Sequence, residues 1–208
     1  MTITLQTVVL RELEPFEADE NIRDLDVRTA FGWRDLTSGL TGKGVPGANQ
    51  PQELAFGPSG IRTNPAFAID DYMHAQPFHV NHDVKVGGKT LLHVHWSTGG
   101  TDTNPVRWEF QVSQAKGHDQ EFFGASVSYF LEIAPNQTSP GAWRHYVSEL
   151  PDIDALIGLE PDTLVFVTLR RVTNGATDNV DDVFGLTVDF HYEADRHATP
   201  NKVPNFYA

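Results

Sequence analysis

The chain has 208 residues, 39% of them hydrophobic and 11% aromatic, which is enough for the buried core of one folded domain. Asp and Glu number 28 against 15 Lys and Arg, and the net charge of −13 would repel a phosphate backbone, so we expect no direct nucleic-acid binding. The absence of cysteine excludes disulfides, thiolate metal ligands and a cysteine nucleophile.

Two further features of the composition bear on fold class and location. The 17 Gly and 13 Pro are spread along the chain, which favours many short strands joined by turns. No apolar stretch approaches about 18 residues, and the start of the chain lacks the basic and apolar regions of a signal peptide. We therefore expect no membrane span, no secretion signal and no membrane partner.

The first part of the chain predicts little regular structure. Residues 1–30 contain an acidic run interrupted by Pro15, which predicts an extended N-terminal arm. Residues 39–65 are rich in Gly and Pro, a composition that does not sustain a helix or a strand ladder. We therefore expect residues 31–76 to form a loop-rich region packed on the core, and residues 77–208 to form that core with a C-terminal tail.

Strand patterns are clearest after Pro77. Residues 82–86 and 90–96 flank Gly87-Gly88-Lys89, which predicts two strands around a tight turn. Residues 106–112 and 184–192 alternate apolar and polar, and residues 164–172 form an apolar run of strand length, with one short helix predicted near residues 152–157. These elements together predict an all-β fold, an antiparallel β-sandwich or jelly roll.

The pair His93 and His95 is the sharpest chemical signal. Residues two apart on a strand share a face, so the two imidazoles could bind one metal ion. The missing ligands could come from His191 with Asp189, or from His79 and His82, if those strands lie adjacent. A cupin motif also carries a Glu shortly after the second His, and none follows here, so the resemblance to a cupin is partial. The alternative, which we favour, places both histidines on the outer face of the sheet, opposite Leu92, Val94 and Trp96, hydrogen-bonded or at a subunit contact.

Other catalytic patterns are weak. No serine stands in a Gly-x-Ser-x-Gly elbow, and the glycines near Lys43 lack the ending of a phosphate-binding loop. We expect no enzyme activity and no cofactor. Large rings near loops and at the C-terminus, and an arginine pair in a predicted strand, are instead candidates for protein interfaces: Phe122, Phe123, Trp143, Arg170, Arg171, Phe206 and Tyr207.

One combination of motifs suggests a family. The chain contains Leu-His-Val-His-Trp at residues 92–96, Val-Arg-Trp-Glu at 106–109, Leu-Arg-Arg at 169–171 and Val-Asp-Phe-His-Tyr at 188–192. This pattern resembles a family of small structural proteins of tailed bacteriophages and prophages over about residues 78–193. The chain has Leu92 where that family usually has Pro, and its long N-terminal region has no counterpart there.

The resemblance implies a virion protein made in the host cytoplasm. We expect a capsid decoration or cement protein that forms a symmetric homo-oligomer, with a trimer favoured, and that binds other virion proteins such as the major capsid protein. Three alternatives stay open. The chain could be a head-fibre, neck or tail component that binds a receptor, or a cupin-like metal-dependent enzyme using His93 and His95. It could also be a carbohydrate-binding sandwich in which tryptophans stack on sugars, although of Trp33, Trp96, Trp108 and Trp143 the second and third are expected to face the core.

Overall fold

The computed structural model describes residues 31–43, 49–102, 104–134, 142–150, 153, 156, 158–175 and 180–195. Within these ranges the chain forms strands joined by turns and loops. The strands are β1 (Phe31–Lys43), β2 (Gln52–Phe56), β3 (Arg62–Ala66), β4 (Tyr72–Ala75), β5 (Phe78–His79), β6 (Thr90–Thr98), β7 (Val106–Lys116), β8 (Val127–Ile133), β9 (Tyr146–Leu150), β10 (Thr163–Val172) and β11 (Val183–Asp195).

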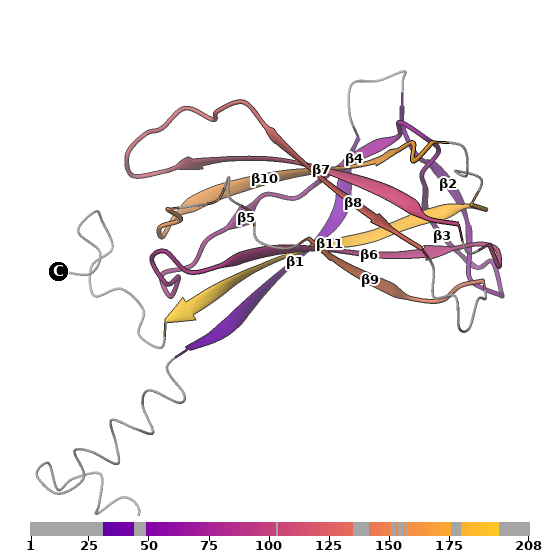
Figure 1. The fold of residues 1–208 in the computed structure, drawn as a ribbon, viewed down its shortest axis with the longest axis horizontal. Coiled ribbons are helices and arrows are strands. Elements are labelled where there is room, and N and C mark those ends of the chain that lie inside the picture. The colour runs from indigo at the N-terminus through magenta and orange to yellow at the C-terminus, as the bar shows by residue number, and fades with distance from the viewer. Residues whose placement is uncertain are drawn as a thin grey trace, which may run out of the picture.

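The strands form two stacked layers, visible edge-on in Figure 1. In one layer, here the β11 sheet, β11 pairs with β1 and β3 on one side and with β6 on the other, β9 extends the β6 side, and β2 pairs with β3. In the other layer, the β10 sheet, β10 pairs with β4, β5 and β7, and β8 lies beyond β7. All these pairings are antiparallel, which confirms the predicted antiparallel β-sandwich of the jelly-roll type.

Strand β1 belongs to both layers. From Phe31 to Gly39 it pairs with β11, and from Leu40 to Lys43 it pairs with β4, with a shift of register between Leu40 and Gly42. Long strands that cross between sheets in this way form the closed corner of a sandwich. The part of β1 from Phe31 to Gly39 therefore lies directly beside β11.

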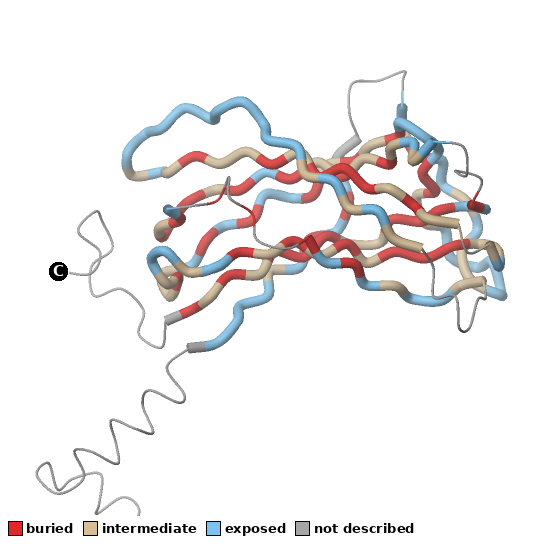
Figure 2. Tube along the Cα trace, in the orientation of Figure 1, coloured by how far each residue is buried: buried red, intermediate tan, exposed pale blue. Residues whose placement is uncertain are grey.

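The core lies between the two sheets and follows the alternation expected from the sequence. Leu92, Val94 and Trp96 of β6 are fully buried, as are Trp108 and Phe110 of β7. Figure 2 shows the same alternation of buried and less buried positions along the central strands. Burial of each large apolar side chain contributes about 1.5–3 kcal/mol, so this shared interior holds the layers together.

The predicted strand at residues 82–86 is wrong. Its only ladder contact is a single bridge between Val84 and Ala194, and turns occupy the rest of the segment. The physical reason is that both edges of β6 are already paired, with β11 and β9, so no edge is left for a hairpin partner. The segment instead follows β11, where Lys85 N donates to Glu193 O at 2.9 Å.

The expectation that residues 39–65 hold no ladder is also wrong for the part that the structure describes. Strand β1 runs on to Lys43, and β2 pairs with β3 from Gln52 and Ala66 to Phe56 and Arg62. Gly39 and Gly42 are part of β1, while Gly57 and Gly60 adopt positive φ in the turn between β2 and β3. Strands β1 to β4 thus make residues 31–76 an integral part of both sheets, a correction to the loop-rich region expected there.

Several expectations lie outside the described residues. They are the N-terminal arm at 1–30, the C-terminal tail beyond residue 195 and most of the predicted helix at 152–157, of which Ile153 and Leu156 are described and buried. Among the described residues, no helix has the length and apolarity needed to span a bilayer.

Candidate functional site

A band of histidines and carboxylates crosses the outer face of the β11 sheet, and we call it the histidine–carboxylate face. Strand register builds it, because β11 places Asp189 opposite His93 of β6, and β6 places His93 opposite Glu149 of β9. On the other side of β11, Asp35 of β1 lies opposite His191. The members of this face are Asp35, His93, His95, His145, Glu149, Asp189 and His191.

The two histidines singled out from the sequence are held by protein side chains. His93 Nε2 contacts Glu149 Oε2, and its ring lies 4.1 Å from that of His191 between centroids. His95 Nε2 is 2.7 Å from Asp189 Oδ2, while its Nδ1 is 2.7 Å from His145 Nε2. Their neighbours in the chain point into the core, which confirms that His93 and His95 occupy the outer sheet face.

A tighter group within this face has the donor set of a metal site. Asp35, Asp189 and His191 each offer one ligand atom, and these atoms all lie within 4.8 Å of one another. His191 was among the metal ligands considered from the sequence, whereas His93 and His95 lie beside this group. Asp35 was missed because residues 31–76 were expected to be loop-rich, so no strand register could bring it to His191.

A second polar cluster surrounds Asp162 at the start of β10. Its carboxylate lies 2.9 Å from His79 Nε2, 2.7 Å from His118 Nε2 and 3.3 Å from His82 Nε2. Burial raises the pKa of Asp162, but the hydrogen bonds with His118 and His79 and the charges of His82 and His79 outweigh it and hold that pKa below its usual value. These contacts connect the start of β10 with the segment around His79 and His82 and with the loop that contains His118.

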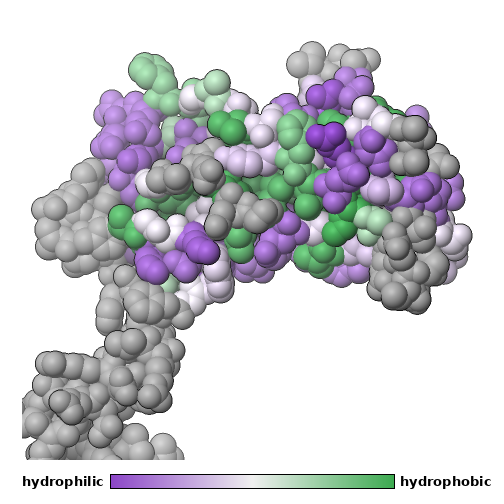
Figure 3. Space-filling view, in the orientation of Figure 1, coloured by the Kyte–Doolittle hydropathy of each residue, from purple (hydrophilic) through white to green (hydrophobic). Residues whose placement is uncertain are grey.

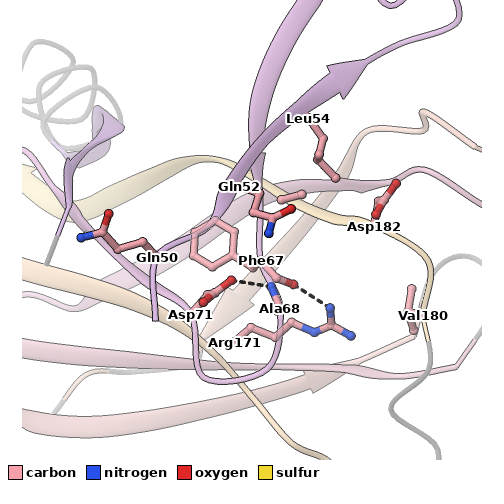
Figure 4. Close-up of a pocket in the computed structure, with 10 residues that line it drawn as sticks. Gln50, Gln52, Leu54, Phe67, Ala68, Asp71, Arg171, Val180 and Asp182 are labelled. Carbon is pink, nitrogen blue, oxygen red and sulfur yellow. Dashed lines mark hydrogen bonds between the residues drawn. The ribbon is translucent and has the colours of Figure 1, made fainter. Parts of the chain in front are cut away.

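A cavity of about 370 Å³ opens near β2 and β3 (Figure 4). Its floor holds Asp71, whose Oδ2 accepts a hydrogen bond from Ala68 N at 2.7 Å, and Arg171, whose Nη1 donates to Phe67 O at 2.7 Å. Burial raises the pKa of Asp71, against the hydrogen bond from Ala68 and the positive charge of Arg171. Both charged groups thus serve to fix the turn at residues 67–71 against β10.

Exposed aromatic rings lie at two places on the outer side of the β10 sheet, one around Phe166 of β10 and one at Phe130 of β8. Phe122 is 97% exposed in the loop before β8, and Phe123 of the same loop packs edge-on against Phe166 of β10, with ring centroids 4.8 Å apart. Phe130 of β8 is half exposed beneath the guanidinium of Arg107, 4.8 Å from its ring centroid. We call Phe122, Phe123, Phe130 and Phe166 the aromatic surface. Figure 2 shows the loop as exposed, and Figure 3 shows apolar atoms at its position at the upper left.

The remaining interface candidates from the sequence have other settings. Trp143 packs edge-on against Phe56, with centroids 5.4 Å apart. Arg170 faces outward and pairs with Asp70 and Glu109. Arg171 points inward and is only 5% exposed, because odd-numbered residues of β10 face the core, so its side chain is a buried group rather than a surface one. Phe206 and Tyr207 lie outside the described residues.

Comparison with known proteins assigns no family. No family model matches the chain, and no curated protein matches it. Among solved structures it is similar to a CBM35 module from Cellvibrio japonicus Abf62, with 14% identity, 76% of this chain and 92% of that chain covered, and a TM-score of 0.37. It is also similar to a xylan-binding module, CBM15, with 9% identity, 77% and 96% coverage and a TM-score of 0.36.

The similar structures also include virus particles. That of infectious bursal disease virus Gt strain matches with 9% identity over 81% of this chain and 37% of that one, with a TM-score of 0.34. Identities and TM-scores this low give no basis for transferring a ligand, an activity or an assembly to this chain.

Proposed function

We propose that this chain is a non-enzymatic structural protein of a tailed-phage virion, which decorates or cements the capsid as a symmetric oligomer. The aromatic surface carries this proposal, as the part that docks on a neighbouring protein subunit. The phage-like sequence motifs suggest the particle, and the aromatic surface suggests how the chain would attach to it.

The energetics favour a partner for these rings. Burying an exposed Phe side chain contributes about 1.5–3 kcal/mol, and neighbouring rings that are buried together form the core of typical protein interfaces. The exposure of Phe122 is especially unfavourable, because this residue is 97% exposed to water. A group of exposed rings on one side of a soluble protein is a common mark of a protein contact.

The charge of the chain adds a restriction on how it assembles. Because each copy carries a net charge of −13, two copies repel each other where their charged surfaces meet. A contact made through uncharged aromatic rings is weakened less by this repulsion than a contact made through charged side chains. On the outer face near Phe130, Arg170 pairs with Glu109 at 3.3 Å, while the Arg107 guanidinium lies over the Phe130 ring.

The test combines light scattering with binding to capsids. The full chain is measured alone over a range of concentrations, and then sedimented with empty capsids of the proposed source phage. A double variant, Phe122→Ser with Phe123→Ser, removes half of the aromatic surface without touching the core. The matched control is Ile61→Ser, because Ile61 is 90% exposed in the turn between β2 and β3, away from that surface.

We expect the natural chain to form a defined oligomer that binds capsids in high copy number. The double variant should lose one or both associations while keeping its β-sheet circular dichroism, and the Ile61 variant should keep both. A chain that stays monomeric and ignores capsids would refute the proposal. Binding at only a few copies per particle would instead favour a head-fibre, neck or tail component.

A further inference from the structure

The group of Asp35, Asp189 and His191 on the histidine–carboxylate face comes from two neighbouring strands. Strand pairing places Asp35 of β1 directly opposite His191, and Asp189 lies two residues earlier on the same face of β11. Asp189 is only 5% exposed, whereas the side chain of Asp35 is 54% exposed. Asp189 is therefore a buried member of the group, whereas the side chain of Asp35 lies at the surface and is free to change its rotamer.

Two polar atoms of this group lack the partners that buried atoms need. Asp189 Oδ2 contacts His95 Nε2, but Asp189 Oδ1 is buried with no hydrogen-bond partner among the described residues. His191 Nε2 lies 3.0 Å from Asp35 Oδ1, yet it too is buried and makes no well-directed hydrogen bond within the described part of the chain. Leaving such atoms unsatisfied is costly, and a bound cation would satisfy both.

We propose that Asp35, Asp189 and His191 bind one divalent transition-metal ion, with Zn²⁺ as the probe of choice. The ligands are a carboxylate oxygen of Asp35, Oδ1 of Asp189 and Nε2 of His191. Metal–ligand bonds of about 2.0–2.2 Å put ligand atoms at most about 4.4 Å apart, so a small rotation of the exposed Asp35 side chain completes the group. A water molecule would fill the remaining position.

The neighbouring histidine supports this set. His95 holds Oδ2 of Asp189 at 2.7 Å and is itself held by His145 at 2.7 Å, so the carboxylate is oriented with its other oxygen toward the ion. Such outer partners commonly fix metal-binding carboxylates. The imidazole among the ligands favours Zn²⁺ or a neighbouring first-row ion such as Ni²⁺ over Ca²⁺, which takes six to eight oxygen ligands.

The experiment is a titration of the full chain, made without a histidine tag and freed of metal with a chelator. Zn²⁺ binding is measured by calorimetry, and Co²⁺ binding by the visible absorption bands that report nitrogen and oxygen ligands. The variants are Asp35→Asn and His191→Gln. Asp35→Asn is the decisive one, because its exposed side chain can change without disturbing the core. The matched control is His79→Gln, which alters a histidine of the Asp162 cluster.

We expect one equivalent of Zn²⁺ per chain, and a rise in melting temperature with Zn²⁺. Loss of an outer partner of a metal site typically weakens binding about 10–100-fold, so Asp35→Asn and His191→Gln should weaken it by at least about tenfold. His79→Gln should bind as the natural chain does. Absence of saturable binding, unchanged affinity in Asp35→Asn, or loss of binding in His79→Gln would each overturn the proposal.

Discussion

The hydrogen bond between Trp96 and Ser148 gives a sharp test of the core. Trp96 Nε1 donates to Ser148 Oγ at 2.8 Å, and the two residues are 0% and 2% exposed. The bond joins β6 to β9, the edge strand of the β11 sheet. Ser148→Ala removes the acceptor with little change in volume and leaves the indole N–H buried away from water.

The expected cost follows from that burial. A buried donor left without a partner costs about 1–3 kcal/mol of the free energy of unfolding. For a chain of this size, each kcal/mol corresponds to about 2–4 °C in melting temperature. The melting temperature of Ser148→Ala should therefore fall by about 2–12 °C, whereas Ser126→Ala, at an exposed loop position, should change it little.

A double-mutant cycle separates the lost bond from other effects. Trp96→Phe removes the donor, so Ser148→Ala in that background should cost far less than it does alone. The measurement is chemical denaturation at one fixed protein concentration, because an oligomer would make stability depend on concentration. If Ser148→Ala cost the same in both backgrounds, to within about 0.5 kcal/mol, the hydrogen bond would not be the cause.

Three further changes test other parts of the structure. Asp162→Asn should destabilise the fold near neutral pH, measured by urea denaturation. Because the folded-state pKa of Asp162 is lowered, its ionised form stabilises the fold at pH values above the unfolded-state pKa of about 4. The difference in unfolding free energy between Asp162→Asn and the natural chain should therefore shrink as pH falls through the folded-state pKa. A difference that grew at low pH would contradict this reasoning. Gly185→Ala should cost about 1–3 kcal/mol in the same assay, because the new Cβ would lie 2.8 Å from Phe67 Cε2, and a neutral result would contradict the close packing at this bulge in β11. Phe190→Ala should cost about 3–5 kcal/mol, read from the denaturation midpoint, because its ring is fully buried between the sheets beside Phe78, and a loss below about 1 kcal/mol would place it outside the core.

The strands that could be predicted from the sequence are those with one face on the core and the other face toward solvent. Strands β6, β7 and β11 alternate because each contacts the core on one side only, so Trp96, Trp108 and Phe190 could be assigned inward from the sequence. Strand β8 differs, because it has exposed apolar residues on both faces. Its core-facing Val127 is 45% exposed and its outward-facing Phe130 is 50% exposed, so hydrophobicity alone could not tell one face of that strand from the other.

The candidate sites were predictable only in part, because they depend on register between strands that are distant in the sequence. His93 and His95 could be paired from their spacing, but the partner of His191 is Asp35, 156 positions earlier in the chain. The cluster on Asp162 likewise joins His79, His82 and His118 from other segments. Spacing within a strand fixes which face a residue occupies, and only the pairing of whole strands fixes its neighbours.

The two proposed surfaces lie on opposite outer faces of the sandwich, so they can be tested apart. Phe166 projects outward from the β10 sheet, and Asp189 projects outward from the β11 sheet, with the shared core between them. Sites that are far apart and share no contacts behave independently, so Asp35→Asn should leave the oligomer intact and the Phe122 and Phe123 double variant should still bind Zn²⁺. If Asp35→Asn instead dissociated the oligomer, the histidine–carboxylate face would be a subunit contact, and the metal would join copies of the chain rather than lie within one.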